Sequence, residues 1–130
     1  MFALDTNTVI HFFKGAGNVA SAVLARPPHE IAQPAPVLLE VEIGILGSAN
    51  PARKREQFSE FLGSVTILPL DKYAAEVAAR VRMQLEKTGR GIGPMDTLIA
   101  GVALAHSATL VTHNTKEFGR VKGLRIEDWY

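Results

Sequence analysis

The stretch MFALDTNTVIHFF, residues 1–13, decides how the fold begins. Its first apolar run, residues 2–4, stops at the carboxylate of Asp5, and apolar residues resume at Val9. The run predicts a short buried strand, and residues 6–14 then predict a helix. Burying an unpaired carboxylate costs several kcal/mol, so an acid at the end of a buried strand needs a partner. The rest of the chain must supply the partner of Asp5.

The composition is that of one compact domain spanning residues 1–130. A chain of 130 residues with 47% hydrophobic content can enclose a sizeable core. No apolar run approaches the roughly 18–20 residues that cross a bilayer, and the first residues lack the order of a signal peptide. Cysteine is absent, which excludes disulfides, thiol catalysis and thiolate metal sites. We therefore expect a cytoplasmic protein with no contact with a membrane.

Strand-like and helix-like segments alternate along the whole chain. Strands are expected at residues 2–4, 30–33, 64–70, 109–112 and 124–129. Helices are expected at residues 6–14, 19–24, 36–48, 50–63, 72–89 and 94–108. This alternation predicts an α/β fold with a mostly parallel central sheet of about four or five strands flanked by helices. Ligands of such sheets gather at the carboxyl ends of the strands.

Four distant segments each bring a polar side chain into apolar surroundings. Asp5 follows the first strand, Asn114 follows a later one, Asp96 begins a late helix, and Glu40 and Glu42 lie in an otherwise apolar helix. Each has an ordinary explanation when taken alone. Asp5 would cap a helix, Asp96 would favour a helix dipole, the glutamates would be solvated, and Asn114 would lie in a turn.

Taken together, these side chains indicate a metal site. Carboxylates that meet in one crevice repel one another unless a cation lies between them. The available ligand atoms are oxygens, with no cysteine and few histidines, which suits Mg²⁺ or Mn²⁺ better than Zn²⁺. Such an ion can activate water and stabilise charge on a phosphodiester, which is nuclease chemistry.

Only one of the two neighbouring glutamates can face such a site. At about 100° per residue, Glu40 and Glu42 point roughly 200° apart on a helix. Glu40 shares a stripe with Gly44 and Gly47, small residues that permit close approach by another element. Glu42 is flanked by apolar residues at helical spacing. The periodicity favours Glu40 and leaves Glu42 open.

Five segments carry a familiar pattern. They are LDTN at 4–7, PVLLEVEIG at 36–44, GIGPMDTLIAG at 91–101, LVTHNTKEF at 110–118 and GLRIEDWY at 123–130. In order and spacing they resemble the PIN-domain ribonucleases, and more closely the VapC toxins of type II toxin–antitoxin modules. The resemblance covers nearly the whole chain. It implies a PIN-like three-layer sandwich and a Mg²⁺- or Mn²⁺-dependent endoribonuclease that hydrolyses RNA to inhibit translation and growth.

The same resemblance implies which residues hold the metal ion. The acids are Asp5, Glu40 and Asp96, and residues 40–44 match the family's signature of an acid, an aliphatic residue, two variable residues and a glycine. The polar residues that support them are Thr6, Asn7 and Thr112. Our hypothesis is that these three acids would hold one metal ion tightly and activate a water for in-line attack on the scissile phosphate, which the metal ion would polarise, with a 3′-hydroxyl as the leaving group.

The fourth acidic position of the wider PIN group is Asn114 in this chain. A neutral side chain there removes one negative charge, so we expect a second metal ion to bind weakly. Asn114 can still hydrogen-bond a metal-bound water. Glu117 is a substitute acid, but we expect its place in the following turn to aim it at solvent.

Several residues around these acids are further candidates for the site. The net charge is only +1, but Lys116, Arg120 and Arg90 are candidates for positioning an RNA backbone. His113 has the position of a general base, although a packed strand-end histidine is the more ordinary interpretation. Trp129 and Tyr130 could stack on a base, although an anchor for the last strand is the more ordinary role.

The resemblance also implies partners. It predicts a cognate VapB-like antitoxin whose tail covers the active-site groove, a homodimer within that complex, and operator DNA reached only through the antitoxin. Transfer RNA is the first substrate to consider. Two alternatives stay open. One is a PIN-fold RNA-binding or interaction module that is catalytically weak because of Asn114. The other is a phosphatase of the haloacid-dehalogenase type, which Asn7 disfavours because a second acid belongs there.

Overall fold

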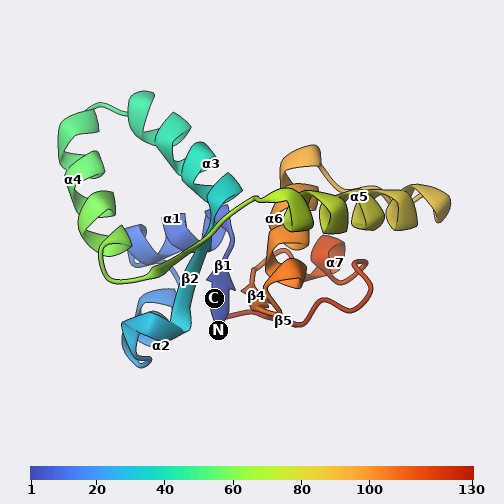
Figure 1. Ribbon diagram of the computed structural model, residues 1–130. Coiled ribbons are helices and arrows are strands. Elements are labelled where there is room, and N and C mark those ends of the chain that lie inside the picture. Colours follow the sequence, from blue (N-terminus) through green and yellow to red (C-terminus); the bar gives the residue numbers. More distant parts are fainter.

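A parallel β-sheet organises residues 1–130, all of which the computed structural model describes (Figure 1). Its five strands are β1 Phe2–Leu4, β2 Ile31–Pro34, β3 Thr66–Leu68, β4 Thr109–Val111 and β5 Ile126–Glu127. They lie in the order β3-β2-β1-β4-β5, and every neighbouring pair is parallel. The predicted α/β fold is confirmed, and the sheet is parallel throughout.

Helices cover both faces of this sheet. They are α1 Thr6–Lys14, α2 Val19–Leu24, α3 Ala35–Leu46, α4 Pro51–Leu62, α5 Lys72–Lys87, α6 Pro94–Ala105 and α7 Thr115–Phe118, with a 3₁₀ turn at Pro28–Glu30. In Figure 1 the first four helices lie to the left of the strands and the last three to the right, so the sheet is the middle of three layers. None of these helices is both long and apolar enough to span a membrane.

The predicted elements differ from the observed ones mainly at their ends. The strand expected at 64–70 is limited to three residues, because Pro69 after it lacks the N–H that a ladder requires. The expected strand at 124–129 has only two paired residues. The short helix α7 is not among the predicted elements.

The central strand β1 fixes where the candidate site residues gather. Ala3 and Leu4 are fully buried, and β1 pairs with β2 on one side and β4 on the other. From β1 the chain first builds the sheet toward β3 and then crosses back to add β4. The crevice between β1 and β4 is therefore the switch point at which open parallel sheets bind ligands.

Helices α5 and α6 pack closely at a glycine. The apolar stripe of α5, which includes Ala74, Ala78 and Leu85, is buried. Opposite it, Gly101 of α6 is itself buried, and a Cβ placed there would lie 2.5 Å from the Ala78 Cβ and 2.6 Å from its Cα. The helix crossing at this point thus requires glycine.

We expect Gly101→Ala to lower the free energy of unfolding by about 1–3 kcal/mol, because the new methyl group must push two backbones apart. Gly44→Ala is the matched control, since a Cβ at Gly44 meets no atom within 4 Å. Alanine is the better helix former, so this control should gain roughly 0.5–1 kcal/mol. Urea unfolding of both variants checks the pair, and equal effects would contradict the close crossing.

Candidate active site

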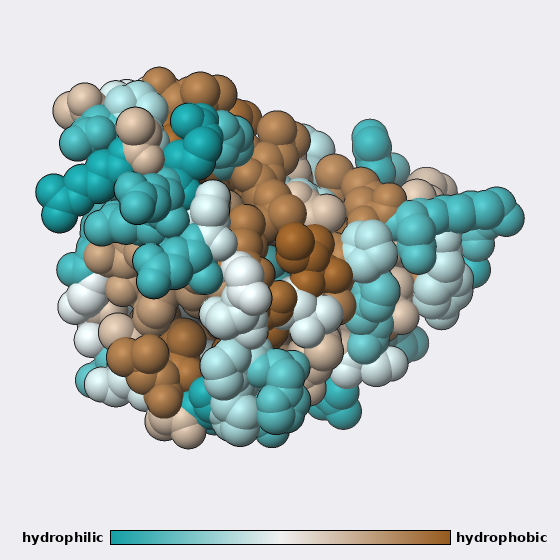
Figure 2. All heavy atoms as spheres, turned by 60° about the vertical axis from the view of Figure 1, so that its left-hand side comes forward, coloured by the Kyte–Doolittle hydropathy of each residue, from teal (hydrophilic) through white to brown (hydrophobic).

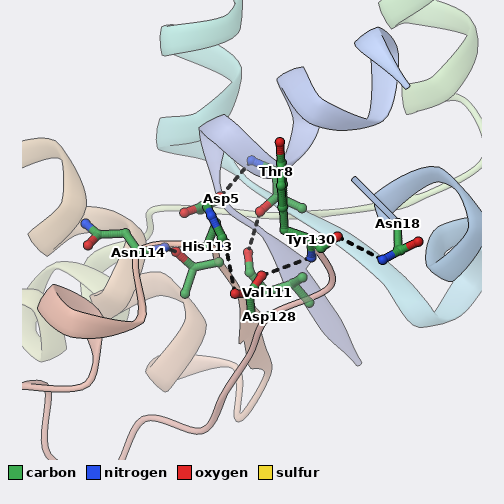
Figure 3. Close-up of polar contacts among 9 residues, drawn as sticks. Asp5, Thr8, Asn18, Val111, His113, Asn114, Asp128 and Tyr130 are labelled. Carbon is green, nitrogen blue, oxygen red and sulfur yellow. Dashed lines mark hydrogen bonds and ion pairs between the residues drawn. The ribbon is translucent and has the colours of Figure 1, made fainter. Parts of the chain in front are cut away.

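Asp5 occupies the junction between β1 and α1 (Figure 3). Its side chain is only 4% exposed, and Oδ1 accepts a hydrogen bond of 2.9 Å from the Thr8 N–H, which caps α1. The Asp5 N–H and the Thr8 hydroxyl both donate to the carbonyl oxygen of Val111, at 3.1 and 3.0 Å. The carboxylate is thus fixed beside the end of β4.

Glu40 faces this junction and Glu42 does not. The Thr6 hydroxyl donates to Glu40 Oε1 at 2.5 Å, which joins the start of α1 to α3. Glu42 forms an ion pair with Arg55 of α4 instead. The two glutamates therefore point to different neighbours, as the helical geometry predicts.

No element of this chain uses the space that the small residues beside Glu40 leave open. A Cβ added at Gly44 would meet nothing within 4 Å, and one added at Gly47 would meet only carbonyl oxygens of its own helix. No other element approaches α3 at these two glycines. Glu40 reaches its neighbour through a side-chain hydrogen bond, so a tight backbone contact is not needed.

The raised pKa of Asp96 indicates an electrostatic interaction among the acids. It lies in the first turn of α6, and its pKa is raised to about 6 by burial and then by the negative charges of Glu40, Asp5 and Glu117. Carboxylates from four segments therefore share one electrostatic environment. As the side chains lie, no three acidic or histidine side chains form a ready-made metal site.

Asn114 and Glu117 form a unit at the end of β4. The buried Thr112 hydroxyl accepts a hydrogen bond of 2.9 Å from the Asn114 N–H, and Asn114 Nδ2 donates to Glu117 Oε2 at 2.7 Å. The expectation that Glu117 is aimed at solvent is wrong, because α7 turns it back toward Asn114. An Asn followed three residues later by Glu is a helix-start pattern that could have predicted α7.

The family described as PIN domain matches residues 2–124. The chain belongs to the PIN-domain family.

Two curated relatives of this PIN domain are named as VapC nucleases. The tRNA(fMet)-specific endonuclease VapC of Shigella flexneri is 34% identical over 128 residues, which is 98% of this chain and 97% of the relative. Ribonuclease VapC2 of Rickettsia felis is 36% identical over 93 residues, covering 72% and 69% of the two chains. The chain is therefore a PIN-domain nuclease of the VapC type.

Two solved structures share the fold over nearly the whole chain. VapBC from Salmonella typhimurium, bound to DNA, has a TM-score of 0.92 at 32% identity, covering 99% of this chain and 98% of that one. VapBC2 from Rickettsia felis, bound to a DNA fragment from its promoter, has a TM-score of 0.91 at 30% identity with the same coverage. The predicted PIN-like architecture is confirmed.

The remaining polar candidates of the PIN domain lie around the acids. Asn7 is exposed in the first turn of α1. Lys116 is exposed on α7, and Arg120 just after it donates to the carbonyl oxygen of Gly91 at 3.3 Å. This bond ties the end of α7 to the loop that carries the exposed Arg90. The three basic candidates therefore lie on α7, just after it, or in the loop that α7 contacts.

His113 is not packed into the strand end. Its side chain is 52% exposed, and its Nδ1 lies 2.9 Å from Asp128 Oδ2. Burial acts to raise the pKa of Asp128, but hydrogen bonds from the Tyr130 N–H and His113 and the charges of His113 and His11 lower it overall. Trp129 is buried against Phe2 and anchors the last strand, as expected.

We expect Asp96→Asn to raise the free energy of unfolding by about 1 kcal/mol at pH 7 without divalent metal, because it removes one charge that its neighbours repel. Asp71→Asn is the matched control. Asp71 caps α5 by accepting from the Ala74 N–H, and asparagine caps equally well, so little change is expected. Urea unfolding measures both, and a loss of stability in Asp96→Asn would contradict mutual repulsion.

Proposed function

We propose that this chain is a Mg²⁺- or Mn²⁺-dependent endoribonuclease that acts as the toxin of a toxin–antitoxin module, with residues 1–130 working as one PIN domain. The observation that carries the proposal is the gathering of carboxylates at the switch point of the sheet, where Asp5 and Glu40 are hydrogen-bonded at the start of α1. Burial and then the charges of Glu40, Asp5 and Glu117 raise the pKa of Asp96, which supports the same arrangement. Membership of the PIN family and VapC relatives along the whole chain support the same function.

The donor set fits a hard divalent cation. Asp5, Glu40 and Asp96 offer only carboxylate oxygens, which suit Mg²⁺ and Mn²⁺. Such a cation, when bound, offsets their repulsion, stabilises charge on a phosphodiester and lowers the pKa of water. Thr6 and the Thr8 N–H orient Glu40 and Asp5 for this role by hydrogen bonding to one oxygen of each.

Asn114 and Glu117 together take the place of the fourth acid. Asn114 donates its amide to Glu117 and so holds that carboxylate near Asp96, whose pKa it helps to raise. The negative charge missing at Asn114 is thereby supplied one helical turn later. Around the acids, Arg90, Lys116 and Arg120 provide positive charge for the RNA backbone.

The nuclease activity can be tested with charge-neutral variants that keep the fold. Asp5→Asn retains the cap of α1, because asparagine accepts from the Thr8 N–H as aspartate does. We expect Asp5→Asn and Asp96→Asn each to lower the RNA cleavage rate at least about 100-fold. Glu42→Gln is the control, since Glu42 pairs with Arg55 away from the site, and its rate should not change. The measurement is cleavage of RNA by antitoxin-free protein in Mg²⁺ or Mn²⁺ and in EDTA.

The alternatives predict other outcomes of this experiment. RNA binding with no cleavage in either metal ion would favour a catalytically weak RNA-binding module. Hydrolysis of a phosphate monoester with no RNA cleavage would favour the phosphatase. A rate that is equal with and without EDTA would contradict metal dependence.

Transfer RNA is the substrate that we propose, because the Shigella relative is named for cleavage of tRNA(fMet). We expect induced expression of the chain to create new RNA 5′ ends inside tRNA, together with growth arrest. The same mapping in cells that express Asp5→Asn is the control and should show neither effect. New ends spread over messenger RNA, with intact tRNA, would contradict this substrate.

The proposed partners are a VapB-like antitoxin, operator DNA bound through it, and a second copy of the chain. The Salmonella and Rickettsia structures are VapBC assemblies bound to DNA, which supports this proposal. Exposed apolar side chains are available for protein partners, and Figure 2 shows a band of apolar atoms across one face. Leu39, Ile43 and Leu46 lie along one side of α3, and Ile67 and Leu70 lie in and just after β3. We place this activity in the cytoplasm, where tRNA is found.

A further inference from the structure

Two exposed aromatic rings are stacked beside the acids. The imidazole of His113 and the phenol ring of Tyr130 have centroids 4.4 Å apart and planes 25° apart. The His113 side chain is 52% exposed, and Tyr130 is 45% exposed. Exposed aromatic rings in a stacked arrangement are the surfaces on which proteins hold unpaired bases. We call these two side chains the stacked pair.

One carboxylate holds both members of the stacked pair. Asp128 Oδ2 lies 2.9 Å from His113 Nδ1, and Asp128 Oδ1 accepts a hydrogen bond of 2.9 Å from the Tyr130 N–H. Figure 3 shows these contacts converging on Asp128. The His113 ring and the Tyr130 main chain are therefore held in place before any ligand arrives, which reduces the entropy cost of stacking on the pair.

The turn between α1 and α2 fixes Tyr130 from its other side. The Tyr130 main-chain oxygen accepts hydrogen bonds from the Asn18 N–H at 2.7 Å and from Asn18 Nδ2 at 3.1 Å. A Cβ on Gly17 would lie 2.6 Å from that oxygen, so only glycine permits this approach. Segments from both ends of the chain thus hold the pair in place.

The outer faces of the stacked pair are not closed by the neighbouring histidine. The His11 ring lies 4.8 Å from Tyr130 at 68° and 6.2 Å from His113 at 79°. These separations, with the 4.4 Å between the stacked rings, place His11 beside the pair rather than in line with it. A flat ligand therefore has a face on which to stack.

The position of the pair relative to the acids indicates the ligand. The Val111 carbonyl oxygen accepts from the Asp5 N–H at 3.1 Å, and His113 follows Val111 by two residues, so the Cα atoms of His113 and Val111 are at most about 7.6 Å apart. A base resting on the pair would belong to a nucleotide close to the phosphate held at the acids. A base can rest there only if it is free of its own stack and pair.

We propose that His113 and Tyr130 form a stacking platform for an unpaired nucleobase next to the scissile phosphate, so that the enzyme selects single-stranded RNA. This inference rests on the proposed ribonuclease function and adds a specificity-determining surface to it. The platform favours any unpaired base over a base in a duplex, because every base offers a π-face.

The test measures base stacking separately from cleavage. The probe is a single-stranded RNA oligonucleotide with 2-aminopurine at successive positions, whose fluorescence falls when the base stacks on an aromatic ring. It is mixed with the Asp5→Asn protein, which binds without cutting. We expect quenching at one position next to the cleavage site, and none when the probe is annealed to its complement.

Variants of Tyr130 then assign the stacking. In the Asp5→Asn background we expect Tyr130→Leu to remove the quenching and weaken binding roughly 5- to 150-fold, and Tyr130→Phe to restore both. Tyr73→Leu is the matched control, because Tyr73 is an exposed tyrosine on α5 and should change neither. In the cleaving enzyme, the Tyr130→Leu effect should appear in KM more than in kcat.

Failure of the platform is distinguishable from failure of the nuclease. RNA cleavage that persists with equal binding in Tyr130→Leu and the parent would overturn the platform and leave the nuclease intact. A His113→Leu variant that quenches the probe and binds RNA as its parent does would likewise overturn the platform, because leucine lacks the aromatic face. Quenching with no cleavage in any metal ion would support the platform and reject the nuclease.

Discussion

The carbonyl oxygen of Val111 holds the functional end of the fold together. It accepts hydrogen bonds from the Asp5 N–H and from the buried Thr8 hydroxyl, so the end of β1 and the start of α1 are both fastened to β4. This double contact sets the depth of Asp5 in the crevice. It also fixes the segment that follows β4, which carries Thr112, His113 and Asn114. Every other contact of the site is arranged around these two strand ends.

The acids differ in how the protein compensates their charge. Asp5 accepts from the Thr8 N–H and Glu40 accepts from the Thr6 hydroxyl, and hydrogen bonds to charged groups contribute about 1.5–3 kcal/mol each. No such bond is found for the Asp96 carboxylate, which carries the raised pKa. Asp96 is thus the acid for which a cation offers the greatest stabilisation.

The features that the sequence predicts are those that repeat or that lie next to one another in the chain. Apolar runs of strand length, caps such as Asp5, and a 3.6-residue period identify most strands and helices. The helical angle between Glu40 and Glu42 is enough to predict that they face different neighbours. The four residues of α7 are too few to show a period, so Glu117 was expected to face solvent. The stripe of small residues at Gly44 permits close approach by another element, but a stripe alone does not say whether an element packs there.

The stacked pair depends on contacts that no local pattern encodes. Tyr130 is positioned by Asn18, which lies 112 residues earlier, and His113 is positioned by Asp128, which lies 15 residues later. Asn18 stands at the N-cap of α2, but its side chain bonds Tyr130 and makes no capping bond. Such a contact follows from the order of the strands, which places β5 at the sheet edge beside β4.

The Asn114–Glu117 unit explains why a neutral residue suits the fourth position. An amide can donate to Glu117, whereas a carboxylate at residue 114 would repel it and add a further charge around Asp96. The unit therefore carries the single negative charge of one acid, placed one turn later and held by a hydrogen bond. The proposed site therefore keeps the negative charge of a fourth acid, and helix α7 positions the Glu117 carboxylate that carries it.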